Sequence, residues 1–276
     1  MTHVKEIINM AMIPKAYMDA VVSIGIRNEN NIHWFGTGFF VFRKIDKDTG
    51  IVYLVTNRHV FEGKNSVVIR LKKKDTNDLI EIDIALKDND KPIFFTHQDP
   101  QVNIAALVLR GDFLQKNDLT LSSFDIETNA ITSTEFCENG GDEGSLIYML
   151  GYPIGLVNEK SNIPICRLGC IARIDKEQVS ATNNFLIDIQ NFPGNSGSPI
   201  ISRPELVAIQ GSKPLNRSLL LGIIHSYIKY QELLQNTQTG QIVEVRSENS
   251  GIANVHPVEY IKELIEKVSQ VIGTDQ

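Results

Sequence analysis

FPGNSGSP, residues 192–199, lies between two apolar, strand-like runs. This pattern predicts a tight turn that holds Ser196 between two strands. Gly194 and Gly197 permit backbone angles that side chains forbid, and they let a substrate carbonyl approach the main chain. The N–H groups of Gly194 and Ser196 are therefore candidate donors to an oxyanion. An ordinary Gly/Ser/Asn/Pro turn has the same composition, so other stretches must decide between the two interpretations.

Two upstream stretches favour a nucleophilic serine. IVYLVTNRHV, residues 51–60, is a β-branched strand that leads to His59, and QVNIAAL, residues 101–107, is an apolar strand that carries Asn103. With Ser196 they give the chain order base, orienting residue, nucleophile. A serine hydroxyl is a weak nucleophile at neutral pH and needs a base within hydrogen-bonding reach. His59 is the candidate base.

These motifs resemble those of the chymotrypsin-like (trypsin-fold) serine peptidases, in particular the bacterial and intracellular branch related to HtrA and the glutamyl endopeptidases. The family's Gly-x-Ser-Gly turn matches residues 194–197, its Thr-x-x-His block residues 56–59, and its Asp-Ile-Ala strand residues 103–105. FGTGFF at residues 35–40 and GYPIG at residues 151–155 resemble two further motifs, so the likeness covers about residues 20–270. It implies a catalytic group of His59, Asn103 and Ser196.

Asn103 is where the sequence departs from the family, which has aspartate there. An aspartate accepts the Nδ1 proton of the histidine, whereas an amide can present its NH₂ group and favour the wrong tautomer. In this family the change costs about 10⁴-fold in kcat, or roughly 5 kcal/mol. Three accounts stay open: the amide is natural in a slow peptidase or pseudopeptidase, it is an engineered change, or another carboxylate takes the role. Asp99 is the nearest such carboxylate in sequence.

The resemblance also places the substrate pocket. Gln190, six residues before the nucleophile, falls at the pocket base, and residues 222–227 form a wall that carries His225. Neither offers a buried carboxylate, so a preference for Lys or Arg is not expected. His225 either bonds an acidic or amide side chain of the substrate or is an ordinary strand histidine. The other histidines considered, His33, His97 and His256, lack a comparable context and are expected to be surface or packing residues.

The pattern of strands and turns predicts an all-β fold: two antiparallel six-stranded β-barrels with a C-terminal α-helix, together forming a single trypsin-like peptidase domain over residues 1–276. Within it we expect an N-terminal arm at 1–19, the first barrel at 20–118, the second at 119–255 and the amphipathic helix at 256–272. The polar segment 230–250 is expected to be a surface insertion whose tip is near residues 235–240.

Composition and charge are those of an ordinary globular protein, with 42% apolar and 22% charged residues. The net charge is −6, and the brief basic run at 70–74 is expected to be a solvated strand end, so we expect no nucleic-acid partner. Three cysteines are too few for a disulfide framework. With no apparent secretory signal or membrane-spanning run, the expectation is a cytoplasmic, bacterial-type protein that does not bind membranes.

Two functions from different classes remain. One is a serine endopeptidase that cleaves protein or peptide substrates through an acyl-enzyme; the other is a catalytically weak relative whose cleft binds peptide as a scaffold or sensor. Neither needs a cofactor or metal. Activation by cleavage is not expected, because Asn195 stands where zymogen-type members have an acidic residue. Control is then expected from a narrow pocket or from a regulatory protein that docks on residues 230–250 or the N-terminal arm.

Overall fold

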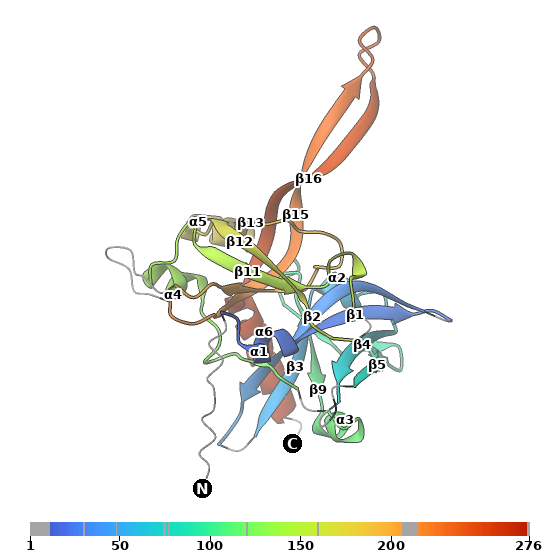
Figure 1. The fold of residues 1–276 in the computed structure, drawn as a ribbon, viewed down its shortest axis with the longest axis vertical. Helices are drawn as coiled ribbons and strands as arrows, with labels where there is room; N and C mark the ends of the chain where they lie inside the picture. Colours follow the sequence, from blue (N-terminus) through green and yellow to red (C-terminus); the bar gives the residue numbers. More distant parts are fainter. Residues whose placement is uncertain are drawn as a thin grey trace.

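The computed structural model describes residues 12–29, 31–47, 49–73, 76, 78–119, 121–158, 160–205 and 215–274. Two β-units and a long C-terminal helix make up the body, and a two-stranded ribbon projects from it (Figure 1). The predicted all-β fold with a closing helix is confirmed. Of the predicted N-terminal arm, residues 1–11 lie outside the described residues, and α1 occupies Lys15–Asp19.

The first β-unit is an eight-stranded sheet. Seven of its strands follow the order β5-β4-β1-β2-β3-β9-β8, and the eighth, β10, pairs with β2. Its strands are β1 (Val21–Arg27), β2 (Ile32–Lys44), β3 (Gly50–Thr56), β4 (Ser66–Lys72), β5 (Leu79–Ala85), β8 (Phe95–Thr96), β9 (Ala105–Leu109) and β10 (Phe124–Asp125). The six predicted strands are all present, and the two extra ones are two-residue pairings that carry no periodic signal. A separate hairpin joins β6 (Lys87–Asp88) to β7 (Lys91–Pro92).

Alternation of side chains along β2 and β3 divides the apolar residues between two cores. Phe39 and Val55 contribute to one core and their neighbours Phe40 and Leu54 to the other. Successive strand residues point to opposite faces, so a run of buried residues in β2 fills both sides of the sheet. Strand β3, which leads to His59, and strand β2, with which it pairs, are therefore packed on both faces.

The second β-unit is a closed six-stranded barrel, in the order β11-β12-β13-β16-β15-β14. Its strands are β11 (Leu146–Gly151), β12 (Ile165–Arg173), β13 (Phe185–Asp188), β14 (Pro199–Ser202), β15 (Leu220–Gln235) and β16 (Ile242–Pro257). Short helices occupy the connections: α2 (Arg58–Phe61), α3 (Gly111–Lys116), α4 (Ser133–Glu138), η1 (Pro153–Gly155) and α5 (Lys176–Thr182).

Helix α6, Val258–Thr274, holds the two units together. Its buried residues Ile261 and Ile265 belong to one apolar cluster with Tyr53 of the first unit and Ile223 of the second. Val258 and Val268 lie in the same cluster, as the amphipathic pattern of the sequence predicts.

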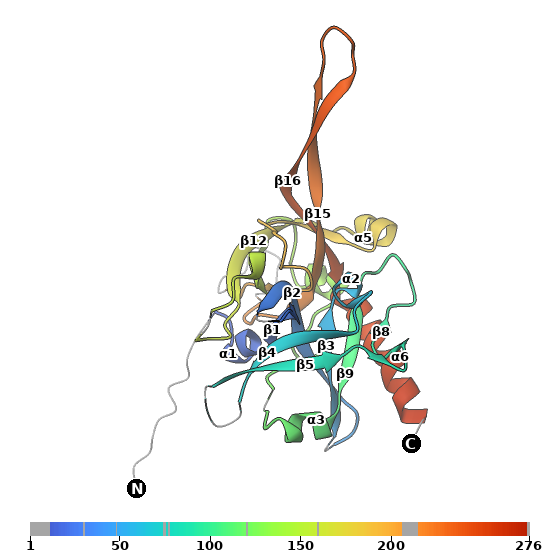
Figure 2. The same ribbon diagram turned by 90° about the vertical axis from the view of Figure 1, so that its right-hand side faces the viewer.

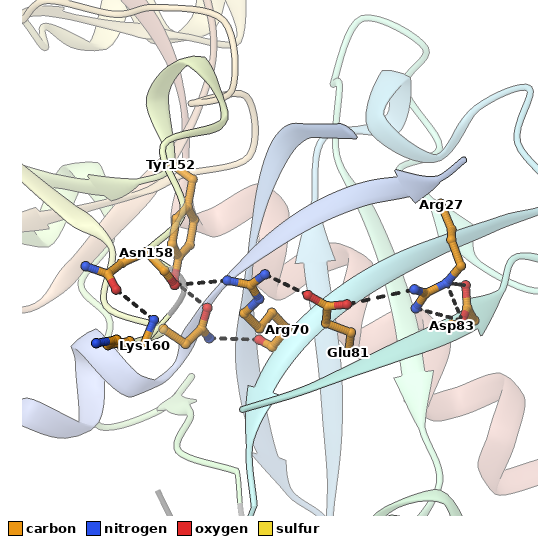
Figure 3. Close-up of polar contacts among 8 residues, drawn as sticks. Arg27, Arg70, Glu81, Asp83, Tyr152, Asn158 and Lys160 are labelled. Carbon is orange, nitrogen blue, oxygen red and sulfur yellow. Dashed lines mark hydrogen bonds and ion pairs between the residues drawn. The ribbon is translucent and has the colours of Figure 1, made fainter. Parts of the chain in front are cut away.

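Polar contacts also cross between the units (Figure 3). Arg70 of β4 donates from Nη1 to the Asn158 carbonyl at 2.9 Å, and its own carbonyl accepts from Asn162 Nδ2 at 2.8 Å. Asn162 in turn accepts from the buried hydroxyl of Tyr152 at 3.1 Å. On its other side Arg70 pairs with Glu81 at 2.6 Å. Of the predicted basic run at 70–74, the last residue lies outside the described residues.

The segment predicted as a surface insertion is a β-ribbon in the structure. Strands β15 and β16 run past the barrel and pair with each other as far as Gln235 and Ile242. Figures 1 and 2 show this ribbon standing clear of the body in both views. The predicted loop tip is confirmed at residues 236–241, but the flanking strands carry too many polar residues for their pairing to be read from hydrophobic alternation.

Replacing Ile265 by alanine should lower the free energy of unfolding by about 2–5 kcal/mol, because it opens a cavity in the cluster that joins the two units. Ile265 is fully buried. The neighbouring Glu266→Ala change, on the exposed face of α6, should stay within about 0.5 kcal/mol. Urea unfolding of both variants checks this, and equal effects would contradict the bridging role of the helix.

Candidate active site

Ser196 lies in a turn between β13 and β14, as the sequence predicts. Gly194 and Gly197 have φ angles of 96° and 89°, which side chains rarely adopt. A Cβ on Gly197 would overlap the Thr37 carbonyl and the Thr56 hydroxyl, and a Cβ on Gly194 would overlap the Tyr152 carbonyl. The two glycines therefore let the turn press against both β-units, with Ser196 partly exposed between them.

Thr37 of β2 positions this turn. Its N–H donates to the Ser196 carbonyl at 2.9 Å, and its hydroxyl donates to the Gly194 carbonyl at 2.7 Å. The same hydroxyl accepts from the Tyr152 N–H at 3.1 Å, and its carbonyl accepts from the Thr56 hydroxyl at 2.7 Å. The sequence drew attention to the Gly-Thr-Gly stretch through the family resemblance, but the role of Thr37 was not predicted.

The N–H groups of Gly194 and Ser196 are left free by these contacts. The Pro193 carbonyl accepts from Ile154 N–H at 2.5 Å, and Asn195 N–H donates to the Phe192 carbonyl at 3.1 Å. Among the described residues, no acceptor bonds the N–H of either Gly194 or Ser196. Their availability is what an oxyanion site needs, because the donors must be fixed before negative charge develops.

Asn103 meets His59 at the other side of the site. Its carbonyl accepts from Arg58 N–H at 3.2 Å and from Asn57 Nδ2 at 3.0 Å, and its N–H donates to His256 Nε2 at 2.9 Å. Both main-chain groups of Asn103 are therefore paired. Its side chain is left to face His59, which lies in the single turn of α2 after β3.

The orientation of the Asn103 amide follows from the main chain of His59. The His59 N–H can only donate, and it lies 3.2 Å from Asn103 Oδ1. Asn103 Nδ2 then faces His59 Nδ1 at 2.7 Å. Because the NH₂ group is a donor, Nδ1 must accept and the ring proton sits on Nε2. Partial burial lowers the pKa of His59, so the ring is neutral at pH 7 and holds this tautomer.

Ser196 and His59 occupy neighbouring segments but are not hydrogen-bonded to each other. The Ser196 turn contacts Thr56, three residues before His59, through Gly197. In the described part of the chain, no hydrogen bond joins the Ser196 hydroxyl to the His59 ring. With its proton on Nε2, the ring has no lone pair there with which to accept the serine proton.

His256, which the sequence analysis set aside, supports the site from behind. It is fully buried in β16; its Nε2 accepts from Asn103 N–H, and its Nδ1 donates to the Asn183 carbonyl at 2.8 Å. Both ring nitrogens are thus assigned, and burial lowers the pKa of His256 to about 4. A neutral His256 is what keeps its Nε2 free to accept, so this residue fixes the Asn103 backbone. No sequence motif marks it.

Asp99 has other partners than His59. One carboxylate oxygen accepts from Gln101 N–H at 2.8 Å and the other from Asn183 Nδ2 at 3.0 Å. In this structure the carboxylate therefore braces the turn of residues 99–101 and the end of α5, and the amide of Asn103 is the group that meets His59 Nδ1.

The predicted pocket residues, Gln190 and His225, lie on adjacent segments. Gln190 is exposed, and its neighbour Asn191 donates from Nδ2 to the Ser226 carbonyl at 3.4 Å. The His225 ring stacks on His256 with centroids 4.0 Å apart, and its Nε2 lies 2.8 Å from Asn184 Oδ1. Burial lowers the pKa of His225 to about 3, so it is neutral at pH 7.

Asn195, next to Ser196, is 1% exposed. Neither its amide nitrogen nor its amide oxygen has a hydrogen-bonding partner among the described residues. The side chain expected at the place of the zymogen's acidic residue is therefore held inside the protein without an ionic partner.

The Ser196 turn and the His59–Asn103 contact lie between two β-units, and the sequence matches a known family over this region. Residues 36–209 match the trypsin-like peptidase domain. The chain belongs to the trypsin-like peptidase family. The match includes strands of both β-units, although β1, β15 and β16 lie outside it, and it contains His59, Asn103 and Ser196.

A search of solved structures finds the MamO protease domain from Magnetospirillum magneticum, in its apo form, at 15% identity and a TM-score of 0.49. The similarity covers 90% of this chain and 96% of that one, and at this level it carries no further argument. No curated protein sequence gives a significant match.

The described residues do not meet the requirements of a metal site, a membrane-spanning helix or a disulfide. No group of three or more His, Cys, Asp or Glu side chains among them is placed to hold a metal ion. No helix of that part of the chain combines the length and apolar character needed to cross a membrane. Cys137, Cys166 and Cys170 are free thiols.

Replacing Thr37 by valine should destabilise the protein by about 1–3 kcal/mol for each group left without a partner, which here are Tyr152 N–H and Gly194 C=O. Thr37 is fully buried, so water cannot take over these contacts. The exposed Thr237→Val change, at the tip of the ribbon, serves as the matched control. Thermal unfolding measures both, and a Thr37 variant as stable as the control would remove the hydroxyl from its positioning role.

Proposed function

We propose that the protein is a serine endopeptidase that acts through an acyl-enzyme on Ser196 and is attenuated by Asn103. The observation that carries this proposal is the pair of free N–H groups, Gly194 and Ser196, in the turn that presents the serine. An ordinary turn has no need of two fixed donors without acceptors beside a partly exposed hydroxyl. Family membership supports a peptidase fold.

In the proposed reaction the Ser196 oxygen attacks the peptide carbonyl while His59 Nε2 takes its proton. The carbonyl oxygen becomes an oxyanion and is bound by the N–H groups of Gly194 and Ser196. Collapse of this intermediate releases the amine, which takes the proton from His59, and leaves an ester on Ser196. Water attacks the ester in the same way and restores the serine.

The first step needs the tautomer of His59 that carries its proton on Nδ1. To accept that proton, Asn103 would have to turn its oxygen toward Nδ1, which brings its NH₂ group against the His59 N–H. Two donors would then face each other. The corresponding loss in this family is about 10⁴-fold in kcat, or roughly 5 kcal/mol, so turnover is slow with the amide in place.

The pocket around Gln190 and His225 favours an uncharged or amide side chain before the scissile bond. His225 is neutral at pH 7 and therefore brings no charge to attract a carboxylate, and Gln190 can both donate and accept. An acidic side chain can still accept from the Gln190 amide, but not from His225, whose Nε2–H donates to Asn184 Oδ1, whereas Lys or Arg would find no carboxylate. The free cysteines support a reducing compartment such as the cytoplasm.

The amide orientation favours a second candidate function, a pseudopeptidase that binds peptides as a scaffold or sensor. A ring locked with its proton on Nε2 leaves the oxyanion donors and the pocket intact, so a peptide can still bind. The two functions differ only in whether the serine reacts.

A fluorophosphonate probe should label Ser196, and Ser196→Ala should abolish labelling. Intact-mass analysis and peptide mapping of the labelled protein make the measurement. Ser198→Ala is the matched control: its hydroxyl is buried in the same turn and has no hydrogen-bonding partner among the described residues, so labelling should persist. A label on another residue, or none even after long exposure, would contradict the peptidase proposal and leave the peptide-binding function, which a binding assay on the pocket can then test.

Asn103→Asp should raise kcat by up to about 10⁴-fold. A carboxylate accepts from both the His59 N–H and Nδ1–H, so it selects the productive tautomer and raises the pKa of His59. The protonated, inactive ring then persists to higher pH, and the acidic limb of the kcat/KM profile should move upward relative to the unmodified protein.

The companion variant Asp99→Asn tests the alternative orienting carboxylate. If Asn103 is the limiting group, Asp99→Asn should change the rate by no more than a few-fold. Ordinary turnover with Asn103 present, no gain on Asn103→Asp and a large loss on Asp99→Asn would together assign the orienting role to Asp99.

A further inference from the structure

The ribbon of β15 and β16 has two free edges. Pairing of β16 with β13 ends at Ile252 opposite Asp188. Beyond it, in the described part of the chain, β15 and β16 pair only with each other, from Lys229 opposite Asn249 to Gln235 opposite Ile242. Figures 1 and 2 show no other element beside this part of the ribbon. Each strand therefore presents unpaired main-chain groups along one edge, which is a template for another strand.

One face of the ribbon is apolar and exposed. Leu233 lies opposite Val245, and these side chains are 54% and 52% exposed. Nearer the tip, where the register of the two strands shifts, Val243 and Ile242 are also exposed, at 71% and 54%. An isolated two-stranded ribbon is marginally stable in water, and apolar side chains gathered on a projecting element indicate an interaction surface.

The outer strand β16 has a sequence that suits pairing with itself. Glu244 and Arg246 flank Val245, and they share the face opposite to Val245 because successive residues alternate. In an antiparallel pair with a two-fold axis at Val245, Glu244 of each copy lies opposite Arg246 of the other. Opposite charges facing each other across strands are stabilising. In one copy the two side chains form an exposed pair with each other, at 3.0 Å, and Glu232 of β15 lies opposite Arg246.

The same symmetric pairing extends the apolar face. Val245 of the two copies would lie opposite each other, with Leu233 of each copy on the next strand outward. Strand β15 offers no comparable match: its charged residues in the ribbon, Lys229 and Glu232, are three positions apart, so a two-fold antiparallel pair of β15 strands would not place them opposite each other.

We propose that two copies of this chain associate through antiparallel pairing of β16 with β16, centred on Val245, and so form a four-stranded sheet from the two ribbons. The occupant of the free edge is thus a second copy of the chain. This association lies outside the catalytic site and does not depend on the proposed peptidase activity.

Size-exclusion chromatography with light scattering on the full chain tests the association. The unmodified protein should show the mass of two chains. Glu244→Arg and Arg246→Glu each place like charges opposite each other twice, so each should weaken dimerisation at least tenfold and show the mass of one chain at the same concentration. Glu266→Arg makes the same charge change on the exposed face of α6 and should stay dimeric.

Mixing the two single variants provides the sharper measurement. One copy then carries Arg at 244 and 246 and the other carries Glu at both, so the cross-strand contacts become attractive and a dimer of the two variants should form. The double variant Glu244→Arg/Arg246→Glu should dimerise by itself. A monomeric unmodified protein, dimeric single variants or a mixture that stays monomeric would each overturn the proposal.

Discussion

The buried hydroxyl of Thr37 is the contact on which the site depends. It accepts a hydrogen bond from Tyr152 of the second unit and donates one to the carbonyl of Gly194, so a single oxygen in the first unit links two segments of the second. The main chain of Thr37 adds the contact to the Ser196 carbonyl. Among the described residues, the carbonyls of Gly194 and Ser196 are bonded in this way and their N–H groups have no acceptor. The packing of the two β-units therefore positions the two groups that we propose as oxyanion donors.

At position 103, one atom of the side chain decides whether His59 Nδ1 faces a hydrogen-bond donor or an acceptor. Asn103, which the sequence resemblance aligns with the family's aspartate, has both main-chain groups bonded and its side chain against His59. An aspartate would satisfy the same backbone N–H and would also accept from Nδ1. The amide has a single acceptor oxygen, and the His59 backbone N–H already donates to it. Geometry is preserved while the proton is placed on the wrong ring nitrogen.

The sequence predicted what depends on local patterns and missed what depends on distant pairs. Alternation gave the strands around His59 and Asn103, and glycine spacing gave the Ser196 turn. The support from His256 could not be predicted, because it arises where β16 returns to the first unit 153 residues after Asn103. The role of Thr37 joins residues 157 positions apart. The ribbon was read as an insertion because polar residues alternate with too few apolar ones to mark two strands.

His256 explains why the site stays assembled with an amide at position 103. Its neutral ring has one nitrogen that donates to the Asn183 carbonyl and one that accepts from Asn103 N–H, and both bonds are made by main-chain partners. The Asn103 backbone is therefore held by groups that do not sense whether its side chain is an amide or a carboxylate. Protonation of His256 would remove its acceptor, but burial keeps the pKa near 4, so the support persists at neutral pH. Because these contacts involve only the main chain of Asn103, we expect an aspartate at this position to change the tautomer of His59 without disturbing the fold.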